Sequence, residues 1–273
     1  MYLSKIRLNQ SPQARRALLE ALKDGAYGSH QLLWRLFDDN ERHFLYRQEQ
    51  GDGYQAPSGE PLFYVLSRTP PRDHAGIFEI HIKAFSPRLN PGDRLAFRLR
   101  VNPTVCRDGK RHDVLMDAQM GWLREQLDGQ GLDKDGQKGE LRMRLLDFAT
   151  DVELAGWREI IHQGRHRQAL ERPLGRSETL DLALKSQAER ALADWWQQRL
   201  PGLGAEEAPG GALSVAGYQR HSIPKKHRLA AFSSVELAGE IHIQAPDTLL
   251  EHLCNGIGRA KAFGCGLMMI RRI

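Results

Sequence analysis

The stretch Arg94-Leu95-Ala96-Phe97-Arg98-Leu99-Arg100-Val101 alternates polar or small side chains with larger apolar ones at every position. A period of two is typical of a β-strand with one buried face, and here the opposite face is mostly arginine. Residues 235–243, which read VELAGEIHI, alternate in the same way. The two segments predict half-buried strands, and they decide the fold class of the second half of the chain.

The other elements predicted for the second half complete the strand and helix order of a known fold. A helix with Leu250, Leu253 and Cys254 on one face follows residues 235–243, and a glycine-rich loop then leads to a last strand from about Leu267. Helix Arg190–Leu200 supplies the first helix of the unit. The order β-α-β-β-α-β is that of a ferredoxin-like domain.

The first half predicts the same order with a weak or missing second helix. Ser11-Pro12 opens one helix, and Ser29 caps a short second one that runs to Phe37. Strands are expected over residues 2–8, 44–48, 62–68 and 79–85.

The 273 residues are therefore predicted to form an α+β protein of two tandem ferredoxin-like (RNA-recognition-like) domains. The first spans residues 1–90 and carries the candidate Tyr and His described below. The second spans residues 91–273, and about 117–189 of it form an α-helical insertion.

Positive charge is concentrated in one region. The chain has 39 Lys and Arg against 34 Asp and Glu, a net charge of +5, and residues 94–112 alone hold six Lys or Arg against one Asp. An arginine-rich proteome explains the total charge but not this clustering. The clustering favours a track for backbone phosphates.

Several classes of protein are excluded by missing signals. The three cysteines are too few and too widely spaced for a disulfide framework or a two-pair zinc site. The sequence has no apolar signal segment and no membrane-length apolar run, so we expect a cytoplasmic protein. Metalloprotease, EF-hand, nucleophile-elbow and two-metal nuclease patterns are also absent, so we expect chemistry without a metal or cofactor.

Tyr27 and His30 are the candidate catalytic residues. They lie where the short second helix begins, and histidine is the side chain best suited to exchange protons near pH 7. A structural histidine is the alternative. A catalytic role requires that the ring be accessible and lie close to the glycine-rich loop and the arginine-bearing strand.

Three basic segments are candidate phosphate-binding sites. In the loop GIGRAKAFGCG (256–266), glycines allow backbone N–H groups to approach a phosphate, although a tight packing turn would also use glycine. The strand and turn 94–112 and the expected hairpin 220–228 carry further cations. The candidates are Arg98, Arg100, Arg107, Lys110, Arg111, Lys225, Lys226, Gly256, Gly258, Arg259, Lys261, Gly264 and Gly266.

These segments together resemble a known family, the CRISPR-associated endoribonuclease of the type I-E Cascade complex (CasE family). The resemblance covers about residues 1–112 and 190–273. It rests on MYLSKIRL (1–8), Tyr27-x-x-His30-Gln31-x-Leu33-Trp34-x-Leu36-Phe37, FLYR (44–47), FRLRVNPT (97–104), GKRH (109–112) and GIGRAKAFGCGL (256–267). The long segment 117–189 departs from the family pattern.

The resemblance implies that the protein cuts CRISPR repeat RNA hairpins and stays on its product with other Cascade subunits, with no membrane partner. It also places the family's catalytic Tyr and His on Tyr27 and His30. Because RNA carries its own nucleophile, the 2′-OH, such an enzyme needs no metal and leaves a 2′,3′-cyclic phosphate and a 5′-hydroxyl.

Two alternatives remain open at this point. In a non-catalytic RNA-binding subunit of a ribonucleoprotein complex, Tyr27 would stack on a base and His30 would be structural. In a nucleotide-binding enzyme, the glycine-rich loop would hold a mononucleotide, but the loop precedes a strand and lacks Walker spacing.

Overall fold

The computed structural model describes residues 1–23, 27–38, 43–49, 61–225 and 228–273, with only the backbone of 224, 225 and 228–230. The chain divides into two compact units. One contains Met1–Asn102 together with Arg199–Ile273, and the other contains Pro103–Gln198. Within the described residues, every helix is too short or too polar to cross a bilayer.

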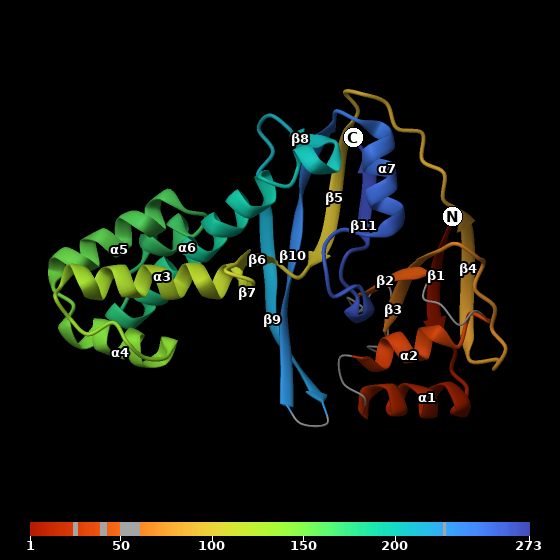
Figure 1. Ribbon diagram of the computed structural model, residues 1–273, viewed down its shortest axis with the longest axis horizontal. Coiled ribbons are helices and arrows are strands. Elements are labelled where there is room, and N and C mark those ends of the chain that lie inside the picture. Colours follow the sequence, from red (N-terminus) through yellow and green to blue (C-terminus); the bar gives the residue numbers. More distant parts are fainter. Residues whose placement is uncertain (24–26, 39–42, 50–60, 226–227) are drawn as a thin grey trace. The chain divides into compact units, whose positions relative to one another are not determined.

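The first module is an antiparallel sheet with two helices on one face (Figure 1). Its strand order, β2-β3-β1-β4, is that of a ferredoxin-like domain, as predicted. Residues 68–77, between β3 and β4, form no helix, which agrees with the prediction of a weak or missing second helix. The elements are β1 (Tyr2–Leu8), α1 (Pro12–Lys23), α2 (Gly28–Trp34), β2 (Phe44–Glu49), β3 (Leu62–Ser67) and β4 (Phe78–Ala84).

The helices of the first module are held against its sheet by an apolar core. Ala14 of α1 and Leu33 of α2 are buried against Ile6 of β1 and Phe63 of β3. The two helices cross closely at Gly28, where an added Cβ would lie 1.8 Å from the carbonyl oxygen of Ala21. Only glycine allows this approach, so the position of α2 is fixed by a missing side chain.

The second module is also an antiparallel sheet, in the order β11-β5-β10-β8, with β9 paired to β10. The predicted alternation of residues 94–101 is confirmed, because Leu95, Phe97, Leu99 and Val101 are buried. The elements are β5 (Arg94–Val101), η3 (Pro201–Leu203), β8 (Ala205–Glu207), β9 (Ser214–Lys225), β10 (Arg228–Ile243), α7 (Pro246–Asn255), η4 (Lys261–Phe263) and β11 (Met268–Arg272).

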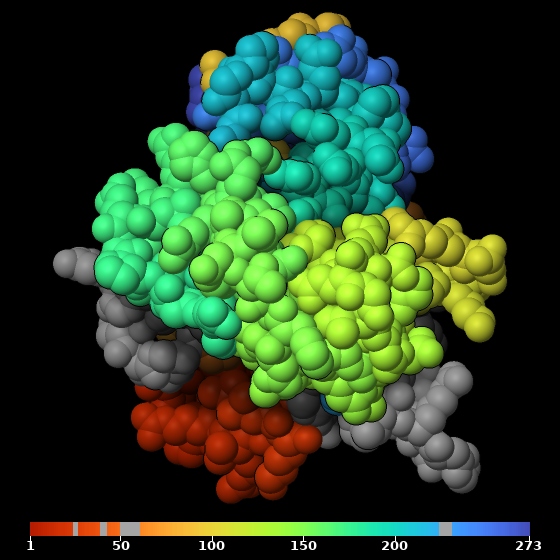
Figure 2. Space-filling view, turned by 90° about the vertical axis from the view of Figure 1, so that its left-hand side faces the viewer, coloured from red at the N-terminus to blue at the C-terminus, as the bar shows by residue number. Residues whose placement is uncertain are grey.

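The helical unit forms around its own core, in which Leu123, Trp157 and Leu180 are fully buried. Thr150 and Glu153 form a capping box that starts α5. Figure 2 shows the outer surface of this unit in yellow-green and green. Its elements are β6 (Thr104–Arg107), β7 (Lys110–Asp113), α3 (Val114–Gly129), α4 (Lys138–Phe148), α5 (Asp151–Gln163), η2 (Arg167–Glu171) and α6 (Arg176–Gln197).

This unit is larger than the insertion expected over residues 117–189. The helix expected over Arg190–Leu200 is the last part of the 22-residue α6, which begins at Arg176. Its Trp195 and Trp196 are buried, and the compact unit extends to Gln198. The sequence pattern located this helix correctly but did not show that it continues from the insertion.

The glycine-rich loop between α7 and β11 packs against the first module. An added Cβ at Gly256 would lie 2.7 Å from the side chain of Leu45, and one at Gly264 would lie 3.2 Å from the ring of Tyr46. At Gly266 it would lie 2.9 Å from the backbone oxygen of Ile257. Since all three have positive φ, close packing explains why these positions are glycine.

We expect Gly266→Ala to destabilise the protein more than Gly258→Ala. Both residues have positive φ, so either alanine costs about 1–3 kcal/mol of backbone strain. Only at Gly266 does the new Cβ also meet backbone atoms, which adds at least ~1 kcal/mol. Urea unfolding of the two variants measures the difference, and equal midpoints would contradict the packing role of Gly266.

Candidate active site

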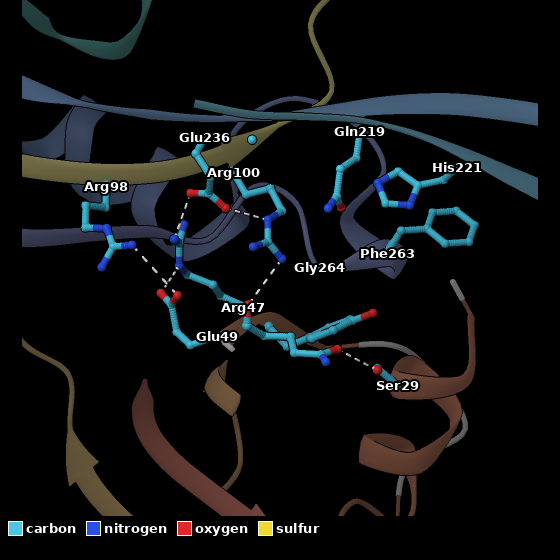
Figure 3. A pocket seen from close by; sticks show the side chains of 13 residues that line it. Ser29, Arg47, Glu49, Arg98, Arg100, Gln219, His221, Glu236, Phe263 and Gly264 are labelled. Atoms are coloured by element: carbon cyan, nitrogen blue, oxygen red, sulfur yellow. Dashed lines mark hydrogen bonds and ion pairs between the residues drawn. The ribbon is translucent and has the colours of Figure 1, made fainter. Parts of the chain in front are cut away.

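A pocket of about 390 Å³ lies between the two modules, and Figure 3 shows its lining side chains. One wall is formed by β2 and the start of α2, and the other by β5, β9, β10 and the glycine-rich loop. Its size is within the range of small-ligand sites. The lining residues are Ser29, Tyr46, Arg47, Gln48, Glu49, Arg98, Arg100, Gly217, Gln219, His221, Glu236, Phe263 and Gly264.

A network of ion pairs centred on Arg47 crosses the pocket. The Arg47 side chain is only 1% exposed, and its guanidinium donates to Glu49 at 2.5 Å and to Glu236 at 2.7 Å. Burial by itself lowers the pKa of Arg47, but hydrogen bonds and charge from Glu49 and Glu236 outweigh it and raise the pKa above its usual value. Glu49 is on β2 and Glu236 is on β10, so this cation joins the two modules.

Arg98 and Arg100, both predicted to bind RNA, belong to the same network. Arg100 donates to Glu236 at 2.5 Å and to the backbone oxygen of Gln48 at 3.1 Å. Arg98 is 62% exposed, with Glu49 at 3.8 Å. With Arg47, three arginines face two glutamates, so the network carries a net charge of +1. Arg98 is the cation most accessible to a phosphate, whereas Arg100 is already paired.

His30 lies close to the glycine-rich loop, as the catalytic hypothesis requires, but its ring is not accessible. The side chain is 2% exposed and packs against Phe44, with ring centroids 5.4 Å apart, and against Trp34 at 5.2 Å. Tyr27, which is 38% exposed, lies 4.9 Å from the His30 ring and 5.9 Å from Phe263 in the loop. In this conformation His30 is therefore a core side chain behind the pocket wall, which corrects the expectation of an open ring.

The glycine-rich loop uses part of its backbone for hydrogen bonds to neighbouring elements. The N–H groups of Gly256 and Gly266 donate to the backbone oxygens of His252 and Arg100. The ammonium of Lys261 donates to the backbone oxygen of Asn255 at 2.6 Å. The N–H groups of Gly256 and Gly266 are therefore already used within the protein, and phosphate binding by the rest of the loop stays a prediction. Gly258 and Arg259 are its exposed members.

The cations of residues 107–112 lie in the helical unit on the hairpin β6–β7. Its turn, Asp108-Gly109, has φ of 50° and 71°, as in the tight turns that close two-residue hairpins. Arg107, Lys110 and Arg111 are exposed, and Arg107 pairs with Asp117 at 2.5 Å. The continuous track expected from Arg94 to Arg111 is therefore divided between two compact units.

Two further candidates fall outside the described side chains. Lys226 lies outside the described residues, and for Lys225 the structure gives the backbone, which pairs with Arg228. The hairpin predicted for this region is present as β9 and β10.

His221 is a pocket residue that the sequence did not single out by itself. It lies on β9 within the basic segment 220–228, and its Nε2 is 2.8 Å from the Oγ of Ser234. The ring stacks on Phe232, with centroids 4.5 Å apart. Burial, and then the charge of Arg100, lower the pKa of His221 below its usual value.

Two further pocket residues that the sequence did not single out are Arg47 and Glu236. A signal existed for Glu236, because the alternation of residues 235–243 places it on the polar face of its strand. The observed register pairs it with Arg100 of β5. Arg47 follows three apolar residues, and nothing in that run indicates a buried cation. Among the described residues, no group of three or more His, Cys, Asp or Glu could hold a metal ion.

Comparison with known proteins gives consistent matches. A family model described as CRISPR associated protein matches residues 1–272. The CRISPR-associated endoribonuclease Cse3 of Thermus thermophilus is 30% identical over 166 residues, which cover 56% of this chain and 74% of Cse3.

Solved structures share the fold at lower identity. CRISPR endoribonuclease Cse3 bound to 19 nt RNA has a TM-score of 0.61 at 21% identity and covers 99% of this chain and 100% of that chain. A chain of a CRISPR RNA-guided surveillance complex has a TM-score of 0.51 at 19% identity and covers 100% of both chains. The two-module α+β architecture is therefore the one found in these proteins.

We expect Glu236→Gln to weaken folding and Glu240→Gln to have little effect. Glu236 balances the buried Arg47, and its neutralisation should cost roughly 2–3 kcal/mol, less than a fully broken buried pair because Glu49 remains. Glu240, on the same strand, pairs with the half-exposed Arg94, so its neutralisation should cost under ~1 kcal/mol. Chemical denaturation of both variants tests this, and similar losses would show that the Arg47 network does not stabilise the modules.

Proposed function

The chain belongs to the CRISPR-associated protein family, and we propose that it cleaves CRISPR repeat RNA hairpins by attack of a ribose 2′-OH on the adjacent phosphate. Its endoribonuclease activity rests on the relationship to Thermus Cse3 and on the family match over residues 1–272. The metal-free route and its products are the proposal. The pocket between the modules, lined by Arg98 and Arg100, supports it most directly.

The reaction needs few groups from the protein. The 2′-oxygen must be held in line with the phosphorus and the 5′-oxygen, one group must accept the 2′-OH proton, and another must protonate the leaving oxygen. Arg98, which is exposed at the pocket, can neutralise charge that develops on the phosphate. The products are then a 2′,3′-cyclic phosphate and a 5′-hydroxyl, and no step requires a metal ion.

Within this proposal, His30 transfers a proton after RNA has displaced the rings that cover it. Tyr27 is the exposed ring in contact with His30, and Phe263, its neighbour in the loop, lines the pocket. A base that stacks at this point would replace protein ring contacts with its own. Tyr27 then lies beside the substrate, where its hydroxyl can orient the 2′-OH or the phosphate.

The binding partners follow from the proposed cleavage of RNA hairpins. Most affinity for a stem should come from contacts to phosphates and 2′-OH groups, because the major groove of A-form RNA is deep and narrow. The exposed cations Arg98, Arg107, Lys110, Arg111 and Arg259 are suited to such contacts. We place the protein on its product hairpin as a subunit of a Cascade-type complex, by analogy with the surveillance complex that contains a chain of this fold.

One substrate change tests the nature of the nucleophile. A repeat hairpin from the protein's own CRISPR array, with a single 2′-deoxy nucleotide just upstream of the cut, should resist cleavage in EDTA while the all-ribose hairpin is cut. The deoxy RNA should still bind, because one hydroxyl contributes little to the phosphate contacts. Cleavage of the deoxy substrate would mean that water attacks, and failure to cut the ribose hairpin in EDTA would refute the metal-free route.

His30→Gln should lower the single-turnover cleavage rate by ~10²–10⁴-fold without weakening hairpin binding. Glutamine nearly preserves the side-chain volume, so the aromatic surroundings of His30 should remain packed. His74→Gln, which removes an exposed imidazole in the same module, is the matched control and should cut normally. Normal cleavage by His30→Gln, with an unchanged unfolding temperature, would assign His30 to the core alone.

A further inference from the structure

The pocket holds an imidazole other than His30. His221 lies on β9 and lines the pocket together with Gln219, Arg98 and Arg100, whereas His30 lies behind the pocket wall and is 2% exposed (Figure 3). Of the two rings, His221 is therefore the one that a phosphate in the pocket reaches without rearrangement of the protein.

The orientation of the His221 ring is fixed on two sides. Phe232, its register partner on β10, stacks on it at an interplanar angle of 17°. Ser234, which is 3% exposed, lies 2.8 Å from Nε2. The contact with Ser234 holds the ring in place, and in the tautomer in which Nε2 donates to Ser234, Nδ1 keeps its electron pair and can act as a base.

The surroundings also keep the ring neutral. Burial and the nearby guanidinium of Arg100 lower the pKa of His221, so at pH 7 the ring is in the form that accepts a proton. Glu236, the acidic residue that lines the same part of the pocket, is paired with Arg47 and Arg100. Histidine in this state matches the requirement for a general base near neutral pH.

We propose that His221 is the general base of RNA cleavage and that Ser234 positions it. This inference rests on the proposed function. The proton of the 2′-OH moves to Nδ1 as the bond from O2′ to phosphorus forms. The bond from phosphorus to O5′ breaks with its electron pair on O5′, which takes a proton from His30 as general acid. His221 then returns its proton to water and His30 regains one from water, so protons and electrons balance over one turnover.

The position of His221 explains why the reaction has two separate proton-transfer groups. His30 belongs to the first module and His221 to the second, and the rings of Tyr27, Phe263 and Phe232 lie between them. An in-line displacement needs its base and its acid on opposite sides of the phosphorus. His221 lines one wall of the pocket and His30 lies behind the other, so the two imidazoles meet that requirement once RNA has uncovered His30.

The test compares two substrates in single-turnover cleavage at saturating protein. On ordinary RNA, His221→Gln should lower the rate by ~10²–10⁴-fold, with hairpin affinity and unfolding temperature unchanged. On a hairpin with sulfur in place of the leaving 5′-oxygen, the thiolate leaves without protonation, so the loss of an acid is rescued and the loss of a base is not. His221→Gln should therefore remain slow on the thio substrate, whereas His30→Gln should recover.

The controls separate this inference from the proposed function. His162→Ala, which removes an exposed imidazole from α5, should cut like the unmodified protein. If the unmodified protein cuts the hairpin and His221→Gln cuts equally fast, His221 is not the base although the function stands. Recovery of His221→Gln on the thio substrate would make it the acid, and a loss confined to binding would make it a substrate contact, and either result overturns the proposal.

Discussion

The buried guanidinium of Arg47 is the constraint on which the site depends. A cation that is 1% exposed is stable only while carboxylates stay within bonding distance, and here one carboxylate comes from its own strand and the other from the second module. The pairing restricts β2 and β10 to one relative arrangement. The glycine-rich loop adds close contacts at Leu45 and Tyr46, so the pocket lies between two sheets that are fixed by charge and by packing.

The same network determines how a polyanion can bind. Glu49 and Glu236 balance most of the charge of Arg47, Arg98 and Arg100, so the long-range attraction of the pocket for a phosphate is weak. Binding then depends on where in the pocket the phosphate group lies. A phosphate that reaches Arg100 must compete with Glu236, whereas Arg98 is open to solvent. Specific placement of one phosphate is therefore favoured over general affinity for RNA.

The sequence predicted the strands well because a period of two in residues 94–101 and 235–243 depends only on which face is buried. It predicted less about the site, because the pairing of Arg100 with Glu236 depends on strand register. The burial of His30 had a local signal, since His30 and Leu33 are three residues apart on one face of α2, and Leu33 is fully buried. The boundary expected near residue 190 had no local signal, because the sequence reads as helix on both sides of it, and α6 runs through it from Arg176 to Gln197.

The burial of His30 is compatible with catalysis if RNA can compensate for uncovering it. Tyr27 makes ring contacts with His30 and Phe263, and aromatic pairs are worth ~0.5–1.5 kcal/mol each. A stacked base returns ~1–3 kcal/mol, which is about the cost of separating both pairs. Substrate binding can therefore open the ring at little net cost, whereas without RNA the imidazole stays in the core. His221 needs no such opening, so the two rings differ in when they become available and not only in where they lie.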